Sequence, residues 1–177
     1  MLNRPAWFTR EFAFKLPTWM FPNVVGRLRG TPARLEDLVR GTPAELLMRR
    51  DGDRWSIQEH AGHLLDLSEL DTARLGEFET GARVLTAADR ENRQTHEANH
   101  NAAAIGVILA AFRADRHALC ARLERLDEAS IARAALHPRL QTEMRLIDWT
   151  FFVAEHDDHH LASISGLLRL WRQAADD

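Results

Sequence analysis

The stretch TFFVAEHDDHHLASISGLL at residues 150–168 decides the fold class of this chain. Its apolar residues recur at the three- and four-residue spacing of an amphipathic α-helix. The same periodicity runs through residues 57–79 and 101–126. Segments that alternate between apolar and polar residues and end in turn signals, as strands do, are nearly absent. The chain is therefore expected to be all-α.

Start and stop signals divide the chain into separate helices. Thr31, which stands before a proline, is expected to cap a first helix. Ser56 followed by Glu59 forms a capping-box pattern, which predicts a second helix over residues 57–79. Gly81 is the expected end of that helix.

Two further helices complete the prediction. One is expected over residues 101–126 and the last from about Thr142 to Trp171. Residues 83–99 are expected to be a long connection with some helix, and residues 130–142, which contain Pro138, a loop or a short helical turn. Four amphipathic helices, one of them reached by a long connection, indicate a four-helix bundle.

Composition sets the class of protein. A chain of 177 residues with 45% hydrophobic and 28% charged residues suits one globular domain, expected over residues 22–177. Residues 1–21 are rich in aromatic residues and prolines and are expected to form an N-terminal arm. The net charge of −3 argues against nucleic-acid binding through bulk charge.

The cellular compartment is inferred from features that the sequence does not have. The single cysteine excludes a disulfide within the chain and favours a cytoplasmic protein. The N-terminus has no apolar signal region. The longest apolar run, residues 102–112, is half the roughly 20 residues that a membrane helix needs, so no membrane association is expected.

The most informative feature is the position of three histidines. His156 and His160 lie in the middle of the apolar stripe of the last helix, one turn apart, as helical histidine pairs that chelate metals do. His63 lies on the apolar stripe of the second helix. Because core stripes converge in a bundle, these three imidazoles predict a metal site with an open coordination position. The alternative is three hydrogen-bonded core histidines, which few neighbouring hydroxyl groups could satisfy.

The other histidines lack such surroundings. His96 and His100 share the four-residue spacing, but polar neighbours predict exposed or rim positions. His117 is expected to be solvated, and His137, before a proline, to lie in a loop. Cys120 is expected to be a small core residue.

Two motifs carry a family resemblance. Residues 55–64, WSIQEHAGHL, and 156–164, HDDHHLASI, resemble the two metal motifs of the DinB-like superfamily in sequence, order and separation. The resemblance covers roughly residues 21–172. It implies a DinB-type four-helix bundle, often a homodimer, in which His63, His156 and His160 hold zinc or nickel.

The resemblance leaves the reaction open. It implies either a metal-dependent hydrolase or a transferase that uses a low-molecular-weight thiol, acting on a small-molecule substrate. Glu59 is the candidate general base or orienting residue, with helix capping as the alternative. Trp149, Arg116 and His159 are the candidates for substrate contact, although a surface salt bridge is the simpler role for Arg116. A non-catalytic metal-binding or dimeric interaction protein is the remaining alternative.

Two expectations accompany this interpretation. Asp157 is expected to face solvent, with orientation of a ligand imidazole as the alternative. Acid is expected to remove the metal below roughly pH 6, where imidazoles become protonated.

Overall fold

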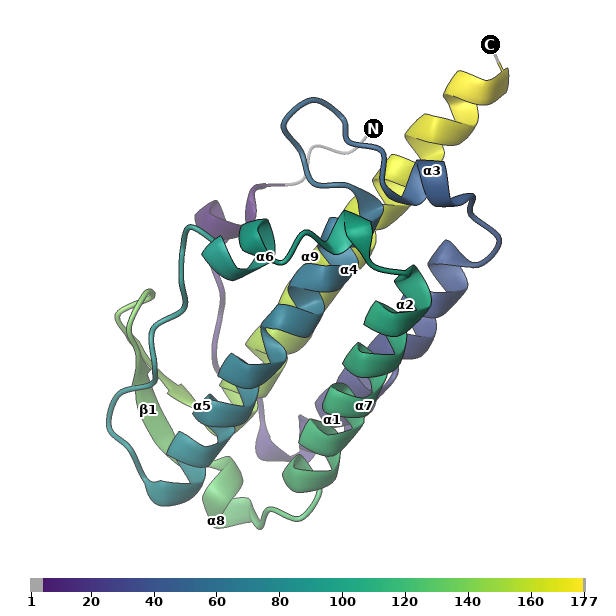
Figure 1. Cartoon of the computed structure of the whole chain (residues 1–177). Coiled ribbons are helices and arrows are strands. Elements are labelled where there is room, and N and C mark those ends of the chain that lie inside the picture. The colour runs from purple at the N-terminus through teal and green to yellow at the C-terminus, as the bar shows by residue number, and fades with distance from the viewer. Residues whose placement is uncertain (1–4, 177) are drawn as a thin grey trace.

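Four helical rods form the frame of the structure, a computed structural model that describes residues 5–176 (Figure 1). The first rod joins α1 (Phe21–Arg29) to α2 (Thr31–Val39), and the second joins α4 (Ile57–Asp66) to α5 (Ser68–Thr80). The third is α7 (Ile105–Leu123) and the fourth is α9 (Leu146–Asp176). Two short helical turns, η1 (Trp7–Thr9) and η2 (Thr18–Met20), precede the first rod. Shorter elements connect the rods: α3 (Ala44–Leu47), α6 (Arg93–Glu97), η3 (His100–Ala102) and α8 (Glu128–Ile131). The predicted four-helix bundle is confirmed.

Two pairs of rods that follow one another in sequence do not pack side by side among the described residues: the first with the second, and the third with the fourth. The α1–α2 rod packs against both α7 and α9, and α4 also packs against both α7 and α9. The α1–α2 and α4–α5 rods therefore face each other across the bundle. This arrangement places α4 beside α9, and these are the two helices that carry the histidine motifs.

Local signals account for the start of α4 and the end of α5. The Ser56 side chain accepts a hydrogen bond from the Glu59 amide, and Glu59 accepts one from the Ser56 amide, so the predicted capping box is present. Gly81 ends α5 with a φ of 76°, in the left-handed region that glycine favours. The expected single helix 57–79 is instead divided at Leu67. Thr31 is a helical residue and not the cap, because Gly30 before it is already helical.

A β-hairpin corrects the expectation for residues 130–145. Strands β1 (Ala134–His137) and β2 (Thr142–Arg145) pair antiparallel, so α9 begins at Leu146 and not at Thr142. Each strand has only four residues. Such a short alternation is too weak to stand out in a sequence, and its stability comes from packing against α9.

The rods enclose a hydrophobic core, and the N-terminal arm packs against it. Cys120 is buried there, as predicted, and burial raises the pKa of its thiol to about 11. The N-terminal arm packs along α9, where the rings of Trp7 and Phe12 lie 5.0 and 5.1 Å from Phe152. Among the helices that the structure describes, none has the length and apolarity to cross a bilayer.

Candidate functional site

Three histidines from two rods meet inside the bundle. His63 comes from α4, and His156 and His160 come from successive turns of α9. Each offers one ring nitrogen, and these nitrogens all lie within 4.8 Å of one another. The two stripes predicted to converge do so at this point.

The closest approach among them fits a shared cation. Nε2 of His156 and Nε2 of His160 are 3.1 Å apart. Two ligands of a tetrahedral ion with metal–nitrogen bonds of about 2.0–2.1 Å would be about 3.3 Å apart. Without an ion, one ring must carry a proton between the two nitrogens. The donor set of three imidazoles suits zinc, nickel and similar divalent ions.

The hydrogen bonds of His63 determine which of its nitrogens is free. The hydroxyl of Thr95 donates to Asp66 at 2.8 Å, so its oxygen must accept from Nδ1–H of His63 at 3.0 Å. Asp66 also accepts from Nε2 of His100 at 2.9 Å. The lone pair of His63 is therefore on Nε2, and the Thr95–Asp66–His100 chain fixes the ring orientation as supporting residues do in metal sites.

A similar contact orients His160. Its Nδ1 lies 2.9 Å from Nδ1 of His60, one turn before His63 on α4. If Nδ1 of His160 donates, its Nε2 keeps the lone pair that faces His156. All three histidines can then present a lone pair to one point.

Burial keeps these imidazoles neutral. Burial first, and then the nearby charges of His60, His100 and His96, lower the pKa of His63 to about 3. The pKa values of His156 and His160 are also lowered, first by burial and then by neighbouring histidines. Neutral imidazole is the form that binds metals.

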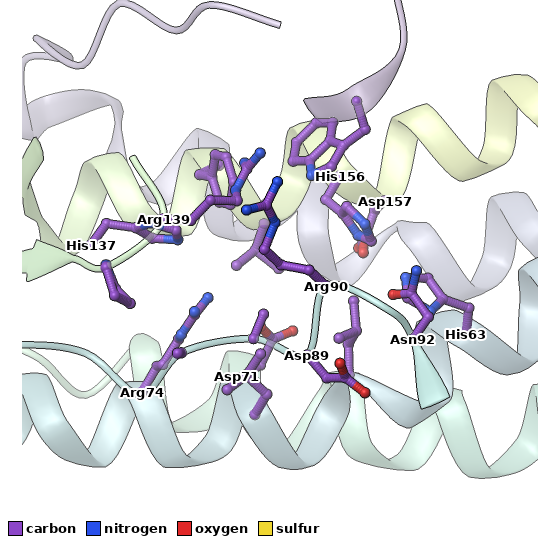
Figure 2. Close-up of a pocket in the computed structure, with 18 of the residues that line it drawn as sticks. His63, Asp71, Arg74, Asp89, Arg90, Asn92, His137, Arg139, His156 and Asp157 are labelled. Carbon is purple, nitrogen blue, oxygen red and sulfur yellow. The ribbon is translucent and has the colours of Figure 1, made fainter. Parts of the chain in front are cut away.

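A cavity of about 310 Å³ opens beside this cluster (Figure 2). His63 and His156 line one end of it, and His137, Arg139 and Arg74 lie toward the other. Leu67, Leu70 and Phe152 supply an apolar wall. The volume is at the lower end of the roughly 300–1,000 Å³ typical of small-molecule sites.

Two tryptophans flank the three histidines. The ring of Trp55 lies 4.8 Å from that of His63, and the ring of Trp7 lies 4.8 Å from that of His156. Trp7 belongs to the N-terminal arm, which therefore forms part of the cavity wall.

Glu59, the candidate base, is engaged elsewhere. It accepts hydrogen bonds from Arg50 at 2.9 Å and from the Ser56 amide at 2.8 Å. Burial raises the pKa of Glu59, but these hydrogen bonds outweigh it and leave the pKa below its usual value. Glu59 is not among the described residues that line the cavity. Its capping role is the one that the contacts support.

Arg116 and Asp157 differ most from expectation. Arg116 is not a surface arginine: its Nη1 donates to Asp71 at 3.0 Å and its Nη2 to Asp157 at 2.9 Å, all three side chains being buried. Asp157 therefore does not face solvent, and burial raises its pKa to about 6. With both terminal nitrogens engaged, Arg116 ties α7 to α5 and α9 at the base of the cavity.

Trp149 and His159 lie away from the cavity wall. Trp149 is fully buried in the core, 5.7 Å from Phe78, and among the described residues it does not line the cavity. His159 lies between Trp7 and His160, with ring distances of 5.6 and 5.5 Å. It is beside the three histidines and outside the group whose nitrogens converge.

Several site residues were not predicted. His100 is buried on Asp66 and is not a rim residue, and His137 is buried at the end of β1 and not in a loop. Thr95, Asp66 and Arg139 also went unnoticed. Only the second histidine pair, His96 and His100, offered a sequence signal, and its polar neighbours concealed the burial.

Comparisons with known proteins give the family and the fold. A family model described as the DinB superfamily matches residues 27–164. The structure is similar to YfiT from Bacillus subtilis, described as a probable metal-dependent hydrolase with an unusual four-helix bundle topology, with 21% identity and a TM-score of 0.81 over 92% of this chain and 93% of that one.

A second solved structure is more distant. The mycothiol-dependent maleylpyruvate isomerase matches with 9% identity and a TM-score of 0.66, over 84% of this chain. The chain spans 61% of that protein's length. No curated protein matches the chain.

Proposed function

The chain belongs to the DinB superfamily, and on that premise we propose that it is a metal-dependent hydrolase with His63, His156 and His160 as ligands. The observation that carries the proposal is the convergence of three ring nitrogens within 4.8 Å beside a cavity. Zinc and nickel are the ions proposed.

The architecture favours catalysis over metal storage. A non-catalytic metal protein should close its metal off, whereas His63 and His156 line a cavity of about 310 Å³. A divalent ion held by three neutral imidazoles supplies Lewis acidity at its remaining coordination position. The chain itself would orient His63 through Thr95, keep the rings neutral and exclude water with Trp7 and Trp55.

Thiol-dependent transfer is the second candidate. It is supported by the structural likeness to a mycothiol-dependent isomerase, whereas the likeness to YfiT extends over nearly the whole of both chains and supports hydrolysis. In both cases the substrate is a small molecule, and neither nucleic acid nor a membrane takes part. We also propose that the protein is cytoplasmic and forms a homodimer.

The test is a set of assays on protein loaded with zinc or nickel. Model esters and amides are offered with and without a low-molecular-weight thiol, and His156→Ala is compared with His117→Ala, a change outside the site. Hydrolysis without thiol, lost only in His156→Ala, is the expected result. Turnover that requires the thiol would establish transfer, and an inert protein that retains metal would establish the non-catalytic alternative.

A further inference from the structure

The end of the cavity away from the three histidines is rich in positive charge. Arg74, Arg90 and Arg139 all line it (Figure 2). Arg74 comes from α5, Arg90 from the connection after it, and Arg139 from the turn of the β-hairpin. No carboxylate within the described residues forms an ion pair with any of them.

The acidic residues that line this cavity are already engaged. Asp71 and Asp157 both bind Arg116. Asp89 accepts hydrogen bonds from the Glu91 amide at 3.1 Å and from the amide of Arg93, the first residue of α6, at 2.9 Å, and it pairs with the Arg93 side chain at 3.2 Å. No carboxylate among the described residues therefore contacts the three arginines as an ion pair, although burial lowers the pKa of Arg74 and the charges of Asp71 and Glu77 act on it in the opposite direction, to raise that pKa.

Arg139 is held in an orientation that suits an anion. Its guanidinium lies over the rings of Phe8 and Phe152, at 5.2 and 5.5 Å, so aromatic rings cover its face. Its Nη2 is buried and has no hydrogen-bond partner among the described residues. A guanidinium stacked in this way offers its edge, which matches a planar carboxylate or a phosphate.

His137 adds a neutral donor. Its Nδ1 accepts from the Leu140 amide at 3.3 Å, which leaves the ring proton on Nε2. Nε2 is buried without a partner among the described residues, in a side chain that is 2% exposed and lines the cavity. Burial, then the charges of Arg74 and Arg139, lower the pKa of His137 to about 4. A buried unpaired donor is costly, so its presence here points to a ligand.

Arg74 supplies the third donor. The side chain is 4% exposed, and its Nε and Nη2 both donate to the Thr86 carbonyl, at 2.9 and 2.7 Å. These bonds fix the guanidinium and leave Nη1 without a hydrogen bond among the described residues.

We propose that Arg139, Arg74 and His137 bind an anionic group of the substrate, a carboxylate or a phosphate, at the end of the cavity opposite the histidine cluster. Arg90, at the exposed rim, attracts the same charge. The apolar wall of Leu67, Leu70 and Phe152, which lines the same cavity, then accepts the body of the molecule. The substrate class is a small organic anion with an apolar body. This inference rests on the proposed function only in placing the reacting end at His63 and His156.

The test is calorimetric titration with benzoate and phenyl phosphate, and with neutral benzamide as the uncharged analogue. We expect saturable binding of at least one anion and at least tenfold weaker binding of benzamide. Which anion binds tighter distinguishes a carboxylate site from a phosphate site.

Three variants locate the binding. Arg139→Gln should weaken anion binding roughly tenfold. Arg83 is an exposed arginine, and Arg83→Gln, which makes the same change in charge, should alter the affinity by no more than about twofold. His156→Ala should retain anion binding even if it loses metal, so this inference can survive failure of the metal proposal. Arg90→Gln, which removes no buried group, is the second test and should weaken binding about threefold.

Two results would overturn the inference. One is an absence of saturable anion binding to the wild-type protein. The other is binding that persists unchanged in Arg139→Gln and Arg90→Gln, or that disappears in His156→Ala alone, because the anion would then bind the metal.

Discussion

Oγ1 of Thr95 lies 3.0 Å from Nδ1 of His63, and the same hydroxyl donates to Asp66. A residue from the long polar connection thus holds a histidine of the bundle core in one tautomer. Thr95→Val should keep the shape but remove this hydrogen bond, and it should weaken metal binding roughly 10–100-fold. Competition with a chromophoric chelator measures the affinity. Thr95→Ser is the matched control and should bind as the wild type does; equal affinity in all three proteins would exclude an orienting role.

Gly62 is required by the close approach of His100. A Cβ atom at position 62 would overlap the His100 ring, which bonds Asp66. Gly62→Ala should therefore lower the free energy of unfolding by roughly 1–3 kcal/mol and weaken metal binding as well. Urea denaturation provides the measurement.

Gly166→Ala is the control for that change. A Cβ atom at Gly166, within α9, meets nothing within 4 Å. The substitution should raise stability by roughly 0.5–1 kcal/mol. Equal effects of the two substitutions would mean that the contact with His100 is unimportant.

The buried pairs of Arg116 should dominate the electrostatic part of stability. Arg116→Leu leaves Asp71 and Asp157 buried without a positive partner, which should cost about 3–5 kcal/mol in urea denaturation. Arg113 lies on the same helix as Arg116 and pairs with Glu36 of α2, and both side chains are partly exposed. Arg113→Leu should therefore have a much smaller effect. Similar losses in the two variants would contradict the importance of burial.

Metal retention should depend on pH in a way that the sequence alone did not predict. An ordinary imidazole takes up a proton at about pH 6.5. Burial lowers the pKa of His63 to about 3, so at about pH 6.5 protons compete only weakly with the metal for this ring. We expect the metal to stay bound through pH 6 and to leave as the pH approaches that lower value. Metal content after dialysis at each pH is the measurement, with circular dichroism to detect unfolding. Loss of half the metal near pH 6.5 from a folded protein would contradict this.

The metal-free protein should respond to acid differently. Its unfolded state takes up protons near pH 6.5, whereas folded His63 does so only near pH 3. Protons thus favour the unfolded state, and the free energy of unfolding should fall as the pH decreases from about 6.5 toward 3. In His63→Gln this decrease should be smaller, because one of the depressed groups is absent. An equal slope in urea denaturation of both proteins would exclude a contribution from His63.

The sequence predicted the helices well and the polar contacts poorly. Helical periodicity extends over many residues, so the rods and the capping box at Ser56 could be recognised. The hairpin could not, because four-residue strands carry too little pattern. Charged residues usually face solvent, and only the packing of α5, α7 and α9 reveals that Arg116 has two buried partners.

The histidines likewise divide into those that the sequence pattern indicates and those whose role only the folded chain shows. His63, His156 and His160 could be singled out as candidate ligands because each stands on an apolar stripe. Thr95 and His100 lie in a connection without periodicity, where only the folded chain shows their contact with α4. Arg139 and His137 escaped notice for the same reason, since their position depends on the hairpin.

The most direct measurement is the metal content of protein purified without a nickel column. Elemental analysis of the wild type should find one divalent ion per chain, and His63→Ala, His156→Ala and His160→Ala should each lose it. His159→Ala and His117→Ala should keep it. An equal metal content in the wild type and His156→Ala would contradict the account.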